Sequence, residues 1–172
     1  MSERDKLIIR LLADTGIRVG ELVALRVDDL VDRDHHQYLK IHGKGARERL
    51  VGIPKLKRRL DRYIRGTQEL RGQARRVFLT LRRGSDGQLA PVTVRGIQKA
   101  VEDAAERAGI HKRVHPHLFR HSYATWAINR GMNPIVLANV LGHSSLTMIH
   151  SVYSHQSPSD MYEAMAKLLV ED

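Results

Sequence analysis

The sequence predicts a mostly helical α+β fold with a small three-stranded antiparallel sheet. Apolar residues recur at helical spacing through most of the 172-residue chain. Residues 28–53 differ, because they contain short apolar runs separated by turn residues, a pattern typical of neighbouring strands. The length suits one domain whose core is large enough to be stable without disulfides. We therefore expect residues 1–172 to form a single domain.

The first half of the chain is predicted to form three helices and the sheet. Residues 5–13 place their apolar side chains on one helical face, and residues 14–16 separate this helix from a second one that begins at Val19. Pro54 opens a third helix, which is strongly basic. The strands are expected at 30–31, 38–41 and 49–53, with turns at 32–36 and 43–45.

The second half is predicted to be a loop followed by four helices. Residues 66–90 are polar except for a short apolar piece at 77–79, which favours a loop. Each helix begins with a capping side chain or an early proline. The helices are expected over about residues 93–108, 116–131, 133–141 and 157–169.

The charge balance points to nucleic acid as the partner. Lys and Arg number 29 against 19 Asp and Glu, a formal net charge of +10, and such a surplus attracts polyanions. Aromatic residues make up only 5% of the chain, which argues against a stacking platform for single strands. We therefore expect a nucleic acid that is not bound as a stacked single strand. Three clusters are placed to contact several phosphates each, at residues 55–59, 71–76 and 82–83.

Composition also excludes several classes of protein. Cysteine is absent, which excludes disulfides, thiolate metal sites and a cysteine nucleophile. No run approaches the roughly 20 apolar residues of a membrane span. The charged N-terminus lacks the apolar stretch of a signal peptide, and no segment joins the basic charge to a large apolar face that could bind a membrane surface. We therefore expect a cytoplasmic protein without a membrane partner.

Two arginines are candidates for holding a phosphodiester. Arginine binds phosphate oxygens bidentately and stays charged at any relevant pH. Arg18 follows a Thr-Gly break near a predicted helix N-terminus, where backbone amides also favour an anion. Glu21, one turn later, is expected to pair with Arg18 or with backbone amides. Arg120 lies on a later helix, one turn after His117 and on the same face.

Other side chains supply a nucleophile and proton donors. Lys44 is at the tip of a glycine-flanked hairpin and can protonate a departing alkoxide. Tyr153 is the candidate nucleophile, because nearby cations lower the pKa of a phenol. His143 follows a glycine at a helix end. Each residue alone fits an ordinary surface or structural role equally well, and only the combination indicates metal-free chemistry on a phosphodiester.

A metal site is the competing interpretation of the histidines. His117 and His121 are four residues apart on one predicted helix, a spacing that can bind zinc. The pair lacks the intervening glutamate of zinc proteases, and Arg120 beside it would repel a cation. We therefore expect no metal and no cofactor.

These motifs resemble those of the tyrosine recombinases, the phage-integrase and Xer-like family, in the catalytic domain. The sequence TGIRVGEL at 15–22 resembles the first arginine box of that family. GKG at 43–45 with ERLV at 48–51 resembles its catalytic-lysine hairpin. HPHLFRHSYAT at 115–125 resembles its His-x-x-Arg box, and LGHSS at 141–145 with Tyr153 resembles its last histidine and nucleophile. The resemblance covers residues 5 to about 165.

The resemblance implies a site-specific DNA recombinase or integrase whose partner is double-stranded DNA. Tyr153 would attack a DNA phosphodiester and form a 3′-phosphotyrosyl link, while Lys44 acts as general acid for the 5′-oxygen. His117 would assist proton transfer with Tyr153. The phosphotyrosine keeps the bond energy, so rejoining needs neither ATP nor metal. The residues expected to hold the scissile phosphate are Arg18, Arg120 and His143, and replacing either arginine is expected to abolish cleavage without loss of the fold.

The resemblance also carries expectations about assembly and domains. Family members usually have a helical core-binding domain before the first arginine box, whereas this chain starts one helix before that box. We therefore expect residues 1–172 to be the catalytic domain, with the N-terminal core-binding domain absent from this chain. Self-association as a tetramer on DNA, through the C-terminal segment, is expected as well.

Three alternatives to this function remain. The first is a catalytically inactive DNA-binding module of the same fold, which would need neither Tyr153 nor Lys44. The second is a metal-dependent nuclease, which would need clustered carboxylates that the sequence does not suggest. The third is a relaxing activity like that of type IB topoisomerases, which shares the same chemistry.

Overall fold

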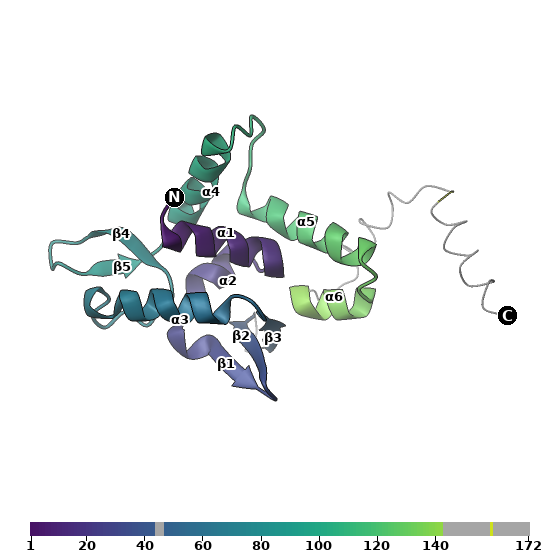
Figure 1. Ribbon diagram of the computed structural model, residues 1–172, viewed down its shortest axis with the longest axis horizontal. Coiled ribbons are helices and arrows are strands. Elements are labelled where there is room, and N and C mark those ends of the chain that lie inside the picture. Colours follow the sequence, from purple (N-terminus) through teal and green to yellow (C-terminus); the bar gives the residue numbers. More distant parts are fainter. Residues whose placement is uncertain (44–46, 143–158, 160–172) are drawn as a thin grey trace.

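Two helices far apart in the sequence, α1 (Glu3–Thr15) and α5 (Pro116–Asn129), pack against each other near the centre of the molecule (Figure 1). The computed structural model describes residues 1–43, 47–142 and Ser159. The face that α1 buries is the apolar face expected from its sequence, formed by Leu7, Ile8, Leu11 and Leu12.

The turn after α1 brings the first arginine motif to a helix N-terminus. The Ser2 side chain caps α1 by accepting the Asp5 N–H at 3.1 Å, and the helix ends at Gly16, whose φ is +61°. The short helix α2 (Val19–Ala24) begins three residues later, with Arg18 as its N-cap residue. The predicted break between two helices is confirmed at this position.

The predicted three-stranded sheet is confirmed. After the 3₁₀ turn η1 (Val27–Asp29), the strands β1 (Leu30–Arg33), β2 (His36–His42) and β3 (Glu48–Gly52) pair antiparallel in the order β1-β2-β3. Leu39 of β2 pairs with residues on both neighbours and is fully buried. The β1–β2 turn has positive φ at two consecutive residues, which matches the right-handed twist of the strands.

The prediction of a loop over residues 66–90 is wrong in its second half. After α3 (Lys57–Gly66) and the 3₁₀ turn η3 (Gln68–Leu70), the strands β4 (Leu79–Arg83) and β5 (Leu89–Pro91) form a two-stranded hairpin. The apolar piece at 77–79 is the anchor, because its side chains are at most 1% exposed and Val77 N–H donates to Leu25 O at 2.9 Å. That contact joins segments about 50 residues apart, so local sequence did not reveal it.

Three further helices complete the described part of the chain, as predicted. They are α4 (Val94–Arg107), α5 and α6 (Pro134–Leu141). Thr93 caps α4 and Asn133 caps α6 by accepting backbone N–H groups at 3.1 and 2.8 Å. The predicted helix over 157–169 lies outside the described residues, apart from Ser159.

The core has two parts that meet beside the arginine motifs. The larger part joins α1, α2, the three-stranded sheet, α3 and α4, and the smaller part joins α5 to α6. The end of α6 lies against β3. None of the helices in the described parts of the chain combines the length and apolar character needed to cross a membrane.

Gly16→Ala is expected to destabilise the protein. An added Cβ would lie 2.8 Å from Tyr123 Cδ1 and 2.9 Å from Leu141 Cδ2, and the left-handed conformation alone costs about 1–2 kcal/mol for a residue with a Cβ. Gly20→Ala within α2 is the matched control, because its Cβ would meet nothing within 4 Å, and it should stabilise by about 0.4–1 kcal/mol. Urea denaturation measures both, and equal midpoints for the two variants would contradict this account of the turn.

Candidate active site

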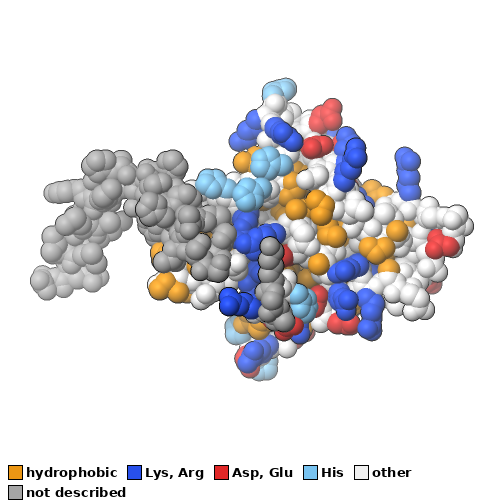
Figure 2. All heavy atoms as spheres, turned by 180° about the vertical axis from the view of Figure 1, so that it is seen from behind, with side chains coloured by type: hydrophobic (Ala, Val, Ile, Leu, Met, Phe, Trp, Pro, Cys, Tyr) orange, Lys and Arg blue, Asp and Glu red, His pale blue; other side chains and the backbone are white. Residues whose placement is uncertain are grey.

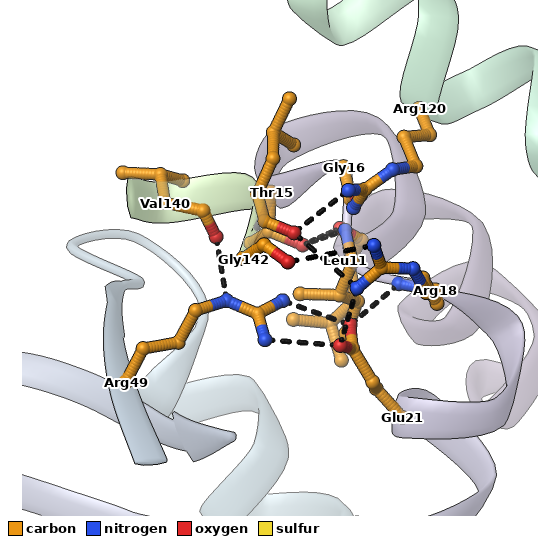
Figure 3. Close-up of polar contacts among 11 residues, drawn as sticks. Leu11, Thr15, Gly16, Arg18, Glu21, Arg49, Arg120, Val140 and Gly142 are labelled. Atoms are coloured by element: carbon orange, nitrogen blue, oxygen red, sulfur yellow. Dashed lines mark hydrogen bonds and ion pairs between the residues drawn. The ribbon is translucent and has the colours of Figure 1, made fainter. Parts of the chain in front are cut away.

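Arginines from three separate elements gather around one carboxylate (Figure 3). They are Arg18 at the start of α2, Arg49 in β3 and Arg120 in α5, and the carboxylate is that of Glu21. On the face opposite that of Figure 1, Lys and Arg side chains form a band near the middle of the molecule, with histidines beside it (Figure 2). Within the cluster three positive charges face one negative charge, which leaves it attractive to an anion.

Arg18 is the exposed member of this cluster. Its backbone N–H donates to Glu21 Oε2 at 2.8 Å, and its Nη1 donates to Glu21 Oε1 at 3.1 Å. The guanidinium also lies 3.5 Å from the carbonyl oxygens of Leu141 and Gly142. The Arg18 side chain is 44% exposed. The expectations that Arg18 lies at a helix N-terminus and that Glu21 pairs with it are both confirmed.

Arg120 lies beneath the surface, where it joins the end of α1 to the end of α6. Only 2% of it is exposed, and its two terminal nitrogens donate to Gly16 O and Leu141 O, each at 2.7 Å. Burial, together with the positive charges of Arg18 and Arg49, lowers the pKa of Arg120 to about 10, so it remains charged at neutral pH. It therefore fastens the turn after α1 to the end of α6 while adding positive charge under Arg18.

Glu21 and Arg49 form the strongest ion pair of the site. Arg49 Nη1 and Nη2 donate to the two carboxylate oxygens of Glu21, both at 2.9 Å, and Arg49 Nε donates to Val140 O at 2.7 Å. Burial alone would raise the pKa of Glu21. The hydrogen bonds from Arg49 and Arg18 and their positive charges more than offset this, and the pKa lies below its ordinary value of 4.5.

Arg49 was not among the residues predicted for the site. Arg49 lies in the segment at 48–51 that resembles the lysine hairpin. Its partner Glu21 is 28 residues away and belongs to another motif. Its only sequence signal is its place just after the hairpin that carries Lys44. A basic residue in an exposed-looking strand gives no reason to expect a buried bidentate pair.

The other predicted site residues are only partly described. His117 is exposed in the first turn of α5, with its ring parallel to that of His115 at a centroid distance of 6.5 Å. Lys44, His143 and Tyr153 lie outside the described residues. Their neighbours are described, because Gly43 N–H donates to Arg47 O at 2.7 Å and Gly142 ends α6 beside the arginine cluster.

The described residues offer an anion site and no obvious metal site. Across residues 1–43 and 47–142, no group of three or more His, Cys, Asp or Glu side chains is placed to hold a metal ion. A half-exposed guanidinium above a buried one can bind two oxygens of a phosphate and stabilise charge that develops on them. Such a site suits chemistry on a phosphodiester.

Comparison with known proteins identifies the class of this domain. Residues 1–160 match the model of the Phage integrase family, and the chain therefore belongs to that family. The resemblance seen in the sequence motifs is confirmed, and so is the fold class.

Individual relatives refine this assignment. A tyrosine recombinase of Pseudothermotoga lettingae is 37% identical over 172 residues, which cover 99% of this chain and 56% of that protein. Tyrosine recombinase XerD of Bifidobacterium longum is 34% identical over 168 residues, covering 93% of this chain and 52% of that protein. The chain thus spans about half the length of the curated relatives it matches.

Solved structures give the same picture. The crystal structure of XerA recombinase matches with a TM-score of 0.75 at 26% identity, over 96% of this chain and 58% of that one. XerH site-specific recombinase, in a pre-cleavage complex with its difH substrate, matches with a TM-score of 0.78 at 26% identity, over 100% of this chain and 49% of that one.

Glu21→Gln is expected to lower stability at neutral pH and to lose this effect in acid. Because the pKa of Glu21 is below 4.5 in the folded protein, its carboxylate contributes stability that is present above that value and is lost as the pH falls through the lowered pKa. The difference in unfolding free energy between wild type and variant should therefore shrink below pH 4.5.

Urea denaturation at about pH 6 and about pH 3 measures this difference. Glu106→Gln, at an exposed position of α4, is the matched control and should stay within about 0.5 kcal/mol of the wild type at neutral pH. A Glu21→Gln difference that grows on acidification would contradict the assignment.

Proposed function

We propose that this chain is the catalytic domain of a site-specific DNA recombinase. It cuts and rejoins double-stranded DNA through a 3′-phosphotyrosyl intermediate, without metal or ATP. The observation that carries the proposal is the half-exposed Arg18 guanidinium, held by Glu21 in the same cluster as the buried Arg120. Membership of the Phage integrase family supports it. We propose a single domain over residues 1–172 and a cytoplasmic location.

In the proposed reaction, the Tyr153 hydroxyl oxygen attacks the scissile phosphorus and the bond from phosphorus to the 5′-oxygen breaks. His117 assists removal of the tyrosine proton, and Lys44 donates a proton to the departing 5′-oxygen. Arg18, Arg120 and His143 hold the non-bridging oxygens, on which negative charge develops. Reversal of the same steps with another 5′-hydroxyl rejoins the strands, since the phosphotyrosyl ester preserves the bond energy.

The relatives support DNA as the substrate. The XerH structures are of that site-specific recombinase bound to difH substrate in a pre-cleavage complex and to palindromic difH substrate in a post-cleavage complex. The net charge of +10 fits the same class of partner here. The alternative, an inactive DNA-binding module, would need neither Tyr153 nor Lys44.

Trapping a covalent adduct tests the proposal. Wild-type protein is incubated in EDTA with nicked DNA substrates taken from the flanks of its own gene, and adducts are resolved in SDS. An adduct that survives EDTA and disappears in Tyr153→Phe is expected, because the phenol oxygen forms the new bond. An adduct that persists in Tyr153→Phe would move the nucleophile elsewhere, and tight DNA binding without adduct would favour the binding module.

The same assay distinguishes the two arginines. Arg18→Ala should slow adduct formation by about 10²–10³-fold and remain folded, because the Arg18 side chain is half-exposed. Lys6→Ala, at an exposed position of α1, is the control. Arg120→Ala is the poorer test, since it leaves two backbone carbonyls without their donor and should unfold more easily.

We also propose that copies of the chain assemble as a tetramer on DNA, with the C-terminal segment of one copy against the next. Three large apolar side chains on α5 and α6 support such a surface, because Trp126, Ile135 and Val136 are at least half exposed. Trp126 also lines a groove of about 560 Å³ beside α1.

Sedimentation of the protein on a DNA with paired sites is expected to show four copies for the wild type and fewer for Trp126→Glu. The apolar contact of the indole is lost in the variant and replaced by a charge. Lys6→Glu serves as the control for the added negative charge. Equal masses for wild type and Trp126→Glu would exclude this surface.

A further inference from the structure

Arg49 has no part in the reaction proposed above, yet its guanidinium lies in the same cluster as Arg18. We infer that Arg49 is a positioning residue that occupies Glu21 and thereby leaves the Arg18 guanidinium available to a phosphate. The inference rests on the proposed function, because it concerns how the phosphate-binding arginine is prepared.

The contacts of Arg49 join three elements. The residue comes from β3, its two terminal nitrogens hold Glu21 of α2, and its Nε holds Val140 O near the end of α6. Its side chain is 14% exposed. A guanidinium is the side chain that can make a planar two-bond contact with a carboxylate and still donate from a third nitrogen. Lysine could not replace all three bonds.

These contacts use the full capacity of Glu21. Its Oε1 accepts from Arg49 Nη1 and from Arg18 Nη1, while its Oε2 accepts from Arg49 Nη2 and from the Arg18 backbone N–H. Each carboxylate oxygen has two acceptor positions, so all four are filled. The bond to the Arg18 side chain is the longest of the four, at 3.1 Å against 2.8–2.9 Å.

The Arg18 guanidinium is therefore held by one bond to the Glu21 carboxylate. If Arg49 were removed, Glu21 would offer two free acceptor positions and an unbalanced negative charge to the nearest guanidinium, which is that of Arg18. A bidentate pair between Arg18 and Glu21 would then compete directly with the phosphate. Arg49 prevents this competition in the wild-type protein.

The position of Gly142 supports a tight fit of Arg49 at the site. Gly142 has φ +66°, and a Cβ added there would lie 2.7 Å from Arg49 Nη1. The Arg49 guanidinium thus packs against the residue that ends α6 and directly precedes His143 in the sequence. A purely structural role for Arg49 would also explain this contact. The test must therefore separate that role from one in which Arg49 keeps Glu21 from pairing with Arg18.

A double-variant experiment makes that separation. Single-turnover adduct formation is measured at saturating DNA for Arg49→Met, Glu21→Gln and the combination of both. Arg49→Met is expected to react about tenfold or more slowly than wild type, because Glu21 captures Arg18. Adding Glu21→Gln should restore part of the rate, since a neutral amide cannot form an ion pair with Arg18. A purely structural clamp predicts instead that the rate of each variant follows its melting temperature, because a buried carboxylate without its partner destabilises the fold whether or not it captures Arg18.

The matched control is Arg65→Met, which removes an exposed guanidinium at the end of α3 and should react at the wild-type rate. Thermal melting shows whether each variant is folded. If Arg49→Met does not fold, Arg49→Lys takes its place. A single ammonium leaves one Glu21 oxygen open to Arg18, so intermediate slowing is expected, again relieved by Glu21→Gln.

A second measurement does not depend on cleavage. Inorganic phosphate is titrated into ¹⁵N-labelled protein while the Nε–Hε resonance of Arg18, assigned with Arg18→Lys, is followed. Phosphate should shift this resonance in the wild type and at several-fold higher concentration in Arg49→Met. Failure of the wild type to form any DNA adduct would count against the proposed function alone. Equal phosphate response in both proteins, or a wild-type cleavage rate in Arg49→Met, would overturn the role of Arg49.

Discussion

The arrangement of this site depends on a single carboxylate, that of Glu21, placed among guanidinium groups at the meeting of three elements. The start of α2, the strand β3 and the end of α6 are joined through Glu21 and its partner Arg49. A buried carboxylate is costly unless it is fully paired, and four hydrogen bonds supply that pairing. The same bonds hold the arginines close together against the repulsion between their positive charges.

Two arginines of the site share a chemical group but differ in environment. Arg18 lies at the surface with one carboxylate bond, whereas Arg120 is enclosed and fastens the turn after α1 to the end of α6. Arg120 supplies positive charge and, because it is buried and hydrogen-bonded, it also holds two elements together. Its removal would therefore change both stability and chemistry. The exposed arginine is less tightly coupled to the fold, because its guanidinium reaches the end of α6 only through two contacts of 3.5 Å, to Leu141 O and Gly142 O.

Much of the fold could be predicted from the sequence, because its signals are local. The α1–α2 break, the strands of the small sheet and the caps at Thr93 and Asn133 each depend on residues within a few positions of one another. The β4–β5 hairpin could not be predicted, since its anchor is a contact between residues 77 and 25. Arg49 was missed for the same reason.

The sequence by itself determined the family, the basic character and the identity of the residues expected at the site. Lys44, His143 and Tyr153 remain predictions that rest on their motifs alone. Only the tertiary structure decided which arginine is exposed, which is buried and which is paired with Glu21. Exposure, burial and the choice of partner depend on which distant segments meet, and no local pattern encodes the contact between Glu21 and Arg49, which are 28 positions apart. Only packing of α2, β3 and α6 around one carboxylate creates it.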